Sequence, residues 1–107
     1  MSGYYSFDIA DGLIKRKLSS IQFTFSHKYV LSRNINNADS TVTIDLTDFT
    51  TILAVMVIST KDITLTINGT GIAITNFLFM EVSSLTSLTV ACSDTTGSQV
   101  EVVIWGT

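Results

Sequence analysis

Cysteine and histidine each occur only once in this 107-residue chain, and proline is absent. The single Cys92 excludes an internal disulfide, and it shares the apolar parity of Leu88 and Val90. We therefore interpret Cys92 as a core residue and not as a nucleophile. His27 has no second histidine as a co-ligand and no serine–histidine–acid order around it, so we interpret it as a rim residue bonded to backbone or water. Nothing here supports an enzyme.

Charged residues are also scarce. They make up 14% of the chain, against roughly 25% in typical soluble domains. The net charge of −3 argues against a general nucleic-acid binder, which would be basic overall. Asp45, Asp48 and Asp62 have neither the spacing nor the glycine of a calcium loop, and we interpret them as solvated carboxylates. No catalytic, cofactor-binding or metal-binding residue is predicted.

No long hydrophobic run is present. Charges between Asp8 and Lys17 interrupt every candidate signal peptide within residues 1–20, so we expect synthesis and function without export. The longest apolar run, Ile52 to Ile58, is too short for a membrane helix. It is typical of a central strand that is covered on both faces.

The residues that are abundant favour strands. Hydrophobic residues reach 46%, and sixteen threonines and thirteen serines accompany many isoleucines and valines. So much apolar surface with so few charges also suggests burial between subunits. We predict one all-β domain over residues 1–107, an antiparallel β-sandwich or jelly-roll of about eight strands.

The clearest local pattern is a β-hairpin around Asn68 and Gly69. A two-residue turn there pairs Ile63 with Ile74 and Leu65 with Ile72, so the large apolar residues share one face. Asn-Gly suits a type I′ turn because both turn positions need positive φ. We therefore predict that this apolar face is buried and that Gly69 has positive φ.

Other strands and loops follow from alternation and turn residues. We expect a half-buried strand at Ile21–His27, a polar contact loop at Ser32–Ser40, and strands at Val42–Leu46, Phe77–Met80, Leu85–Cys92 and Val100–Trp105, with a turn at Asp94–Ser98.

Tyr4 to Leu18 has two interpretations. It can form a hairpin around Asp11-Gly12 in which Ile9 pairs with Ile14 and Asp8 with Lys15. It can equally be an extended arm on a neighbouring subunit, because its apolar residues need burial somewhere. The basic run Lys15–Lys17 is interpreted as a solvated strand edge.

The last strand has two apolar faces. Val100, Val102 and Ile104 share one face, while Val103 and Trp105 are apolar on the face that should be wet. Tryptophan is common at interfaces, although Trp105 could also fold over a sheet edge. We predict a subunit interface that includes Val103 and Trp105 and, from the first strand, Tyr4, Tyr5 and Phe7.

From Val42 to Gly106 the order of motifs resembles small all-β virion structural proteins of tailed bacteriophages. The resemblance is carried by the segments Ile44–Thr47, Ile52–Ile58, Asp62–Thr70, Leu85–Val90 and Val100–Gly106. It implies a non-enzymatic head decoration, head-to-tail or tail component, made in the host cytoplasm and located in the virion. Its implied partners are further copies of the chain and capsid or tail subunits, without membrane or direct nucleic-acid binding. It implies no cofactor and no functional residues.

A carbohydrate- or receptor-binding module is the alternative hypothesis. It would use Tyr4, Tyr5, Tyr29 or Trp105 together with loop asparagines. Aromatic residues clustered in a concave patch would favour sugar binding, whereas a flat apolar patch would favour assembly.

Overall fold

The protein is described by a computed structural model that covers residues 2–11, 14–81 and 84–107, with side chains from Thr24 onward. Ten strands are present in these ranges: β1 (Ser2–Asp11), β2 (Ile14–Thr24), β3 (His27–Ile35), β4 (Val42–Thr43), β5 (Ile52–Ser59), β6 (Ile63–Ile67), β7 (Thr70–Ile74), β8 (Phe77–Glu81), β9 (Leu88–Ala91) and β10 (Ser98–Gly106). One short 3₁₀ turn, Asn37–Asp39, follows β3.

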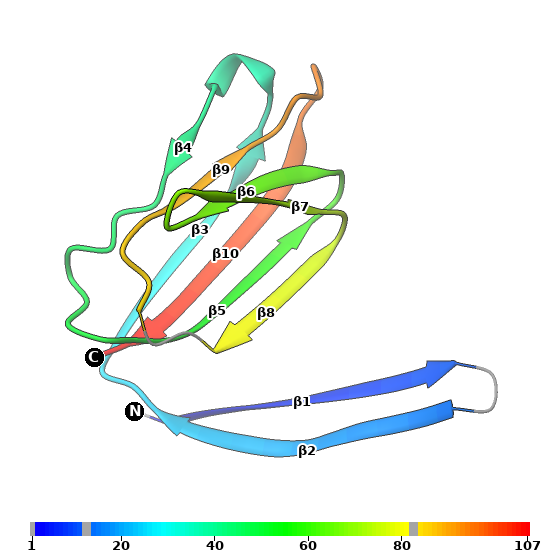
Figure 1. Cartoon of the computed structure of the whole chain (residues 1–107), viewed down its shortest axis with the longest axis vertical. Helices are drawn as coiled ribbons and strands as arrows, with labels where there is room; N and C mark the ends of the chain where they lie inside the picture. Colours follow the sequence, from blue (N-terminus) through cyan, green and yellow to red (C-terminus); the bar gives the residue numbers. More distant parts are fainter. Residues whose placement is uncertain (1, 12–13, 82–83) are drawn as a thin grey trace.

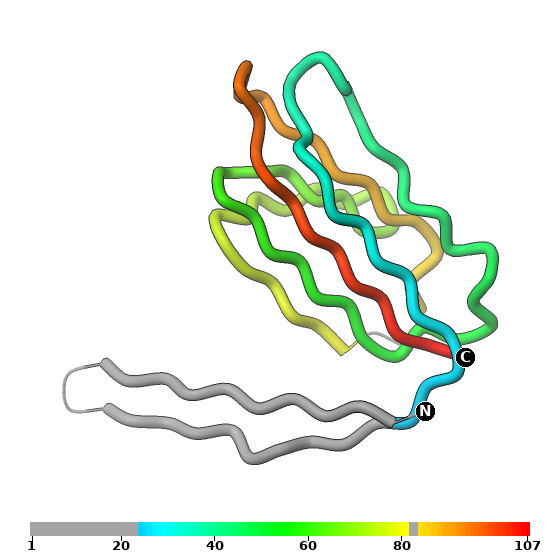
Figure 2. The backbone as a smooth tube through the Cα atoms, turned by 180° about the vertical axis from the view of Figure 1, so that it is seen from behind, coloured from blue at the N-terminus to red at the C-terminus, as the bar shows by residue number. Residues whose placement is uncertain are grey.

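Strands β3 to β10 form two antiparallel sheets of four strands each. The strand orders are β3-β10-β5-β8 and β4-β9-β6-β7, and the two sheets form separate layers (Figure 1). Viewed from behind, the strands of the first sheet lie side by side, with β10 and β5 in its centre (Figure 2). The predicted antiparallel β-sandwich is confirmed.

The strand order is that of a jelly-roll. β6 pairs with β7, β5 with β8, β4 with β9 and β3 with β10, so four nested antiparallel pairs share the β6–β7 turn as their tip. Rolling this long hairpin brings β10 against β5 and β9 against β6, which completes both sheets.

The core lies between the sheets and comes from alternate residues of each strand. β10 contributes the residues predicted from its alternation, Val100, Val102 and Ile104. Cys92 is also buried there, as predicted. The opposite residues of each strand face away from the core.

The central hairpin has the predicted register and turn. Leu65 pairs with Ile72 and Ile63 with Ile74, while Asn68 and Gly69 both have positive φ, 50° and 86°. The prediction that all four apolar residues are buried is wrong at Ile72, which is 41% exposed. β7 is an edge strand of its sheet. Ile72 therefore lies at the side of the sandwich where β7 and β8 leave the core incompletely enclosed, which we call the open side.

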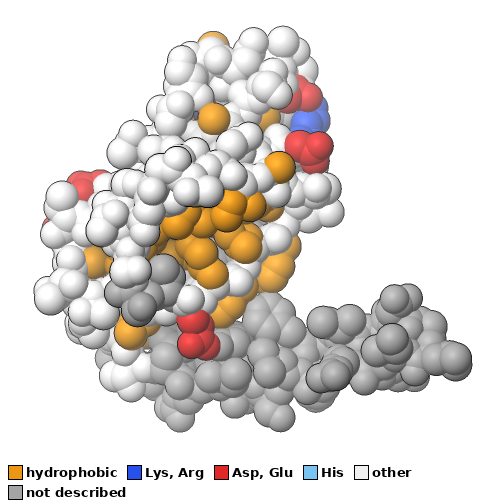
Figure 3. Space-filling view, in the orientation of Figure 1, with side chains coloured by type: hydrophobic (Ala, Val, Ile, Leu, Met, Phe, Trp, Pro, Cys, Tyr) orange, Lys and Arg blue, Asp and Glu red, His pale blue; other side chains and the backbone are white. Residues whose placement is uncertain are grey.

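The same open side is visible in the space-filling view. Hydrophobic side chains gather below the β6–β7 hairpin, where β5 and β8 lie in the ribbon view (Figure 3). From β8, Leu78 and Met80 pack against the core and stay only partly buried. The two sheets therefore enclose the core less completely at β7 and β8.

Asn68 does more than form a turn. Its Oδ1 accepts hydrogen bonds from the backbone N–H of Thr86 (2.7 Å) and Ser87 (3.1 Å) and from the Thr86 hydroxyl (3.0 Å). Its Nδ2 donates to the carbonyl of Ser84 at 2.9 Å, and its backbone N–H donates to the carbonyl of Ser87. One side chain thus attaches the segment before β9 to the tip of the hairpin.

Those bonds explain why β9 is shorter than predicted. The strand expected from Leu85 begins only at Leu88, because the backbone of residues 84–87 bonds to Asn68 and not along a strand. β4, which pairs with β9, is also shorter than the strand predicted over Val42–Leu46. Asp45 Oδ1 accepts from the Thr47 N–H and hydroxyl, which turns the chain just after Ile44.

β5 is central, as predicted, but it is not covered on both faces throughout. Val55 and Val57 face the core, whereas Ile58 points outward and is 40% exposed. The second sheet packs on only one face of β5. A bulge at Leu53 then brings Ile52 into the core, since Trp105 pairs with Ala54 but Gly106 with Ile52.

Two segments near β3 have boundaries that differ from the predicted ones. The strand predicted over Ile21–His27 is divided, because β2 ends at Thr24 and β3 begins at His27. The loop predicted from Ser32 begins only after Ile35, which pairs with Ser98 and is fully buried. The second error arises because β3 is an edge strand. Its solvent-facing residues are polar, as the residues of a loop are.

The first two strands form a hairpin, one of the two interpretations of this segment, but in a register other than the one expected for it. Ile9 pairs with Arg16 and Asp8 with Lys17, two residues from the expected pairing. The turn residues 12–13 lie outside the described residues. Charge pairing could not decide the register, because Lys15 and Lys17 both offer Asp8 an opposite charge.

Leu65→Ala and Ile72→Ala test the uneven burial of one cross-strand pair. We expect the fully buried Leu65 to cost about 2–5 kcal/mol of unfolding free energy, through lost transfer energy and a residual cavity. Ile72→Ala should cost less than about 1 kcal/mol, because much of its surface is already in water. Chemical denaturation of both variants measures the difference. Equal losses would contradict the open side of the sandwich.

Asn68→Gly isolates the side chain of the turn residue. Glycine keeps the positive φ without steric strain, so the loss comes mainly from the four side-chain hydrogen bonds, with a smaller part from the freedom of glycine in the unfolded chain. We expect about 1–2 kcal/mol of destabilisation. The amides of Thr86 and Ser87 should also exchange faster with solvent. Gly71→Ala, in the same hairpin but without positive φ and with room for a Cβ, should leave these amides unchanged.

Candidate functional site

Three of the four large hydrophobic residues that are exposed among the described side chains lie on the outward-facing side of the β3-β10-β5-β8 sheet, where Ala54 and Val103 are buried. We call this surface the outer face. Cross-strand pairing arranges it in three rows: Lys28, Trp105, Ala54 and Glu81; Val30, Val103, Met56 and Phe79; and Ser32, Glu101, Ile58 and Phe77. Figure 2 shows the four strands that carry these rows.

Exposure concentrates on this face. Four large hydrophobic residues are exposed among the described side chains, and three of them belong to the outer face: Val30 at 52%, Ile58 at 40% and Phe77 at 49%. The fourth, Ile72, lies at the open side of the sandwich. Single exposed hydrophobic residues need no explanation, but a cluster on one face indicates an interaction surface.

The structure places the residues predicted for an interface as follows. Val103 is in the middle row of the outer face and is only 4% exposed, while Trp105 is half-buried beside it. Tyr4, Tyr5 and Phe7 lie in β1, opposite Gln22, Ile21 and Leu18 of β2. Their side chains are outside the described part of the structure, so their role in an interface stays a prediction.

Sequence reasoning did not identify Val30 as part of this surface. It recognised that the segments of β5, β8 and β10 are apolar on both faces, but it could not place them side by side. Val30 is an isolated valine between Tyr29 and Leu31, with no local signal. Only its pairing opposite Val103 reveals its role.

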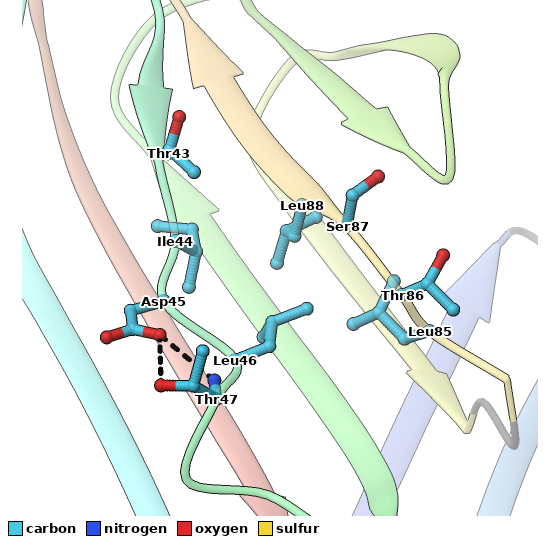
Figure 4. Close-up of a pocket in the computed structure, with 9 residues that line it drawn as sticks. All are labelled: Thr43, Ile44, Asp45, Leu46, Thr47, Leu85, Thr86, Ser87 and Leu88. Atoms are coloured by element: carbon cyan, nitrogen blue, oxygen red, sulfur yellow. Dashed lines mark hydrogen bonds between the residues drawn. The ribbon is translucent and has the colours of Figure 1, made fainter.

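A groove of about 560 Å³ opens where β4 and β9 separate (Figure 4). Ile44, Leu46, Leu85 and Leu88 contribute apolar side chains to it, and Thr43, Asp45, Thr47, Thr86 and Ser87 complete its lining. The hydrogen bond from the Thr47 hydroxyl, followed by that from its N–H, lowers the pKa of Asp45. None of the described residues that line this groove is aromatic, so they offer no stacking platform of the kind that sugar sites use.

The proposed aromatic sugar site does not form from the described residues. Tyr29 packs against the core, whereas Trp105 lies on the outer face of the same sheet. Side chains on opposite faces of a sheet cannot flank one ligand. Of the aromatic residues suggested for sugar binding, the two with described side chains are therefore separated.

The residues considered for catalysis or metal binding are also dispersed. His27 lies edge-on against the ring of Phe49, with centroids 6.3 Å apart. The thiol of Cys92 donates to the carbonyl of Asp62 inside the core. Within the described residues, no three His, Cys, Asp or Glu side chains gather as a metal site.

At the end of the sandwich where β9 leads into β10, the carboxylate of Asp94 organises the turn. Its Oδ1 accepts from the Thr96 hydroxyl (2.6 Å), the Thr96 N–H (2.8 Å) and the Gly97 N–H (3.1 Å), and Lys61 Nζ lies 3.3 Å away. The Thr96 hydroxyl, followed by the Thr96 N–H, lowers the pKa of Asp94 to about 2. These bonds have a structural role, since they close the turn predicted at Asp94–Ser98.

No protein-family model and no curated protein matches this chain. In the part of the chain that the structure describes, no helix is long and apolar enough to span a membrane.

Thr96→Val tests the cause of the lowered pKa of Asp94. Valine keeps the shape of threonine and removes the hydroxyl donor, so the pKa should rise from about 2 toward its ordinary value of 3.8. Because the folded pKa lies below the unfolded one, Asp94 stabilises the native state above pH about 4. That contribution should fade as pH falls toward 2.

Carboxyl chemical shifts followed by NMR across this pH range give the pKa of Asp94 directly. Thr95→Val serves as the control, because Thr95 is the neighbouring exposed residue and is not among the described donors to the carboxylate. If both variants left the pKa near 2, the Thr96 hydroxyl would not be its cause.

Proposed function

We propose that the chain is a non-enzymatic structural subunit of a bacteriophage virion, made in the host cytoplasm, that oligomerises and docks on the capsid or tail through its outer face. The observation that carries the proposal is the gathering of Val30, Ile58 and Phe77 on one face of one sheet. Burial of such a face removes apolar surface from water and drives association.

The fold agrees with this proposal without deciding it. Jelly-rolls occur in viral capsid proteins, but also in lectins and cupins. A fold does not imply a function, so the surface must carry the argument. The groove beside β9 offers no aromatic platform for a sugar and the described acids form no catalytic cluster, so assembly is the use that the described residues favour.

Ile58→Lys and Ile72→Lys form a matched test, because the two isoleucines are equally exposed in strands but only Ile58 belongs to the outer face. Covering a lysine at an interface has a large desolvation cost, whereas a lysine on the surface of a monomer stays in water and has almost none. Ile58→Lys should therefore abolish self-association at concentrations where the original chain and Ile72→Lys still associate. Light scattering across a concentration series measures the mass, and thermal denaturation checks that both variants fold.

The virion role needs a second measurement. Purified virions of the encoding phage should contain the chain, detectable by mass spectrometry, and should bind added Ile72→Lys protein better than Ile58→Lys protein. Virions that lack the chain would reject the proposed location. Equal behaviour of the two variants in both assays would reject the outer face as the docking surface.

A further inference from the structure

We infer that the free edge of β7 binds an extended segment of another protein as an additional antiparallel strand, recognised through its backbone and one large aliphatic side chain. β7 is the last strand of the sheet β4-β9-β6-β7, so among the described strands it pairs only with β6. This edge is separate from the outer face, and the inference goes beyond the proposed function. Strand addition to a sheet edge is a common mode of peptide recognition.

The backbone of β7 has hydrogen-bonding groups that point to this free edge. Because the hairpin has a two-residue turn, Thr70, Ile72 and Ile74 are the residues that exchange hydrogen bonds with β6. The N–H and C=O groups of Gly71 and Ala73 therefore point away from β6, and both residues are exposed. An added antiparallel strand can pair with both groups of each of these residues.

The other edge strands of the two sheets have features that discourage such pairing. β3 carries the exposed Lys28 and Arg33, β8 ends at the exposed Glu81, and β4 has only two residues. Charged side chains and short length are usual means of preventing a new strand from pairing with an edge. β7 contains no charged residue, and its pairing with β6 is regular, without a bulge. The backbone of β7 is therefore open to a further strand.

The added ladder is short, so side chains must also contribute to binding. The turn at Asn68 and Gly69 ends β7 on one side. On the other side, the C=O of Thr75 already accepts a hydrogen bond from the Ser59 hydroxyl at 3.2 Å. A few backbone hydrogen bonds contribute little net free energy in water, and apolar contacts are needed in addition.

Ile72 supplies the apolar contact. Its side chain lies on the core side of the sheet, as that of Leu65 opposite it does, and it remains 41% exposed. Hydrophobic side chains gather next to it at the open side of the sandwich (Figure 3), where Leu78 and Met80 are only partly buried. The residue of an added strand opposite Ile72 points to this same side. A large aliphatic side chain at that position covers Ile72 and closes the open side.

The surroundings of β7 determine the chemistry of the partner segment. From Ile63 to Met80 the sequence contains no charged residue, so a charge on the added strand would lose water without gaining an opposite charge. The face of the hairpin turned away from the core carries Thr64 and Thr66 of β6. The edge therefore suits an uncharged segment in which aliphatic residues alternate with small or hydroxyl residues.

A second copy of β7 is a poorer occupant. Symmetric pairing about Ile72 would place Ile72 beside its own counterpart and Thr70 of each copy beside Ile74 of the other. Ile74 is already buried in its own core and Thr70 is polar, so the second copy would bring only Ile72 to the open side. Leu78 and Met80 would remain uncovered. The partner is therefore a strand of different sequence.

Two synthetic peptides test the inference. Both are blocked peptides of alternating threonine and leucine, one with N-methyl groups on its leucines and the other with N-methyl groups on its threonines. With a leucine opposite Ile72, the threonines pair with Gly71 and Ala73, and the leucine N–H groups point away from β7. The leucine-methylated peptide should therefore shift the NMR signals of the Gly71 and Ala73 amides and slow their exchange with solvent. The threonine-methylated peptide should leave both amides unchanged.

Substitutions in β7 provide the second test. Ala73→Pro removes an N–H group that points to the free edge and leaves the ladder with β6 intact, so it should weaken peptide binding about tenfold or more. Ile72→Lys should have a similar effect, because the bound peptide would cover a lysine. Ile58→Lys, which lies in the other sheet, is the matched control and should bind the peptide as the original chain does. Thermal denaturation shows that each variant folds.

The outcomes separate this inference from the proposed function. If Ile58→Lys blocks self-association but the β7 amides respond to neither peptide, strand addition is overturned and assembly through the outer face stands. Equal binding of the two peptides would also overturn pairing at this edge. Loss of self-association in Ile72→Lys would identify a second copy as the occupant and overturn the inference. A chain that binds the leucine-methylated peptide but is absent from virions loses only the proposed function.

Discussion

The register of the β6–β7 hairpin is the constraint on which the rest of the structure depends. The pairs β5–β8, β4–β9 and β3–β10 are nested outside this turn, so its register determines which residues of these later pairs can face the core. Side chains alternate with a period of two, and a slip of one residue would send Leu65 to the solvent. Asn68 and Gly69 fix that register through positive φ, and the Asn68 amide extends the constraint to the segment before β9.

The pairing within the central hairpin was predictable from the sequence, whereas pairings between strands far apart in the sequence were not. Leu65 and Ile72 are seven residues apart, and their pairing was predictable because a two-residue turn leaves one register. Ile58 and Phe77 pair across the β6–β7 hairpin, while Val30 and Val103 pair across most of the sandwich. No local pattern encodes such partners, so the rows of the outer face could not be assembled from the sequence.

The errors also have local physical causes. The side chains of Asp45 and Asn68 accept hydrogen bonds from the backbone, which ends one strand and delays the start of another. The alternation of apolar residues does not reveal such bonds. Ile72 follows the apolar alternation of its hairpin yet remains exposed, because burial depends on whether a neighbouring sheet reaches an edge strand. The side chains of β3 are polar because β3 is an edge strand, and not because this segment is a loop.

The position of β10 has a consequence for how the protein folds. This last strand of the sequence lies between β3 and β5, in the middle of its sheet, and it supplies Val100, Val102 and Ile104 to the core. During synthesis, β3 and β5 therefore emerge long before the strand that joins them, with unpaired backbone and apolar side chains. Such non-local topologies fold slowly and expose intermediates to aggregation. The core remains incomplete until β10 has left the ribosome.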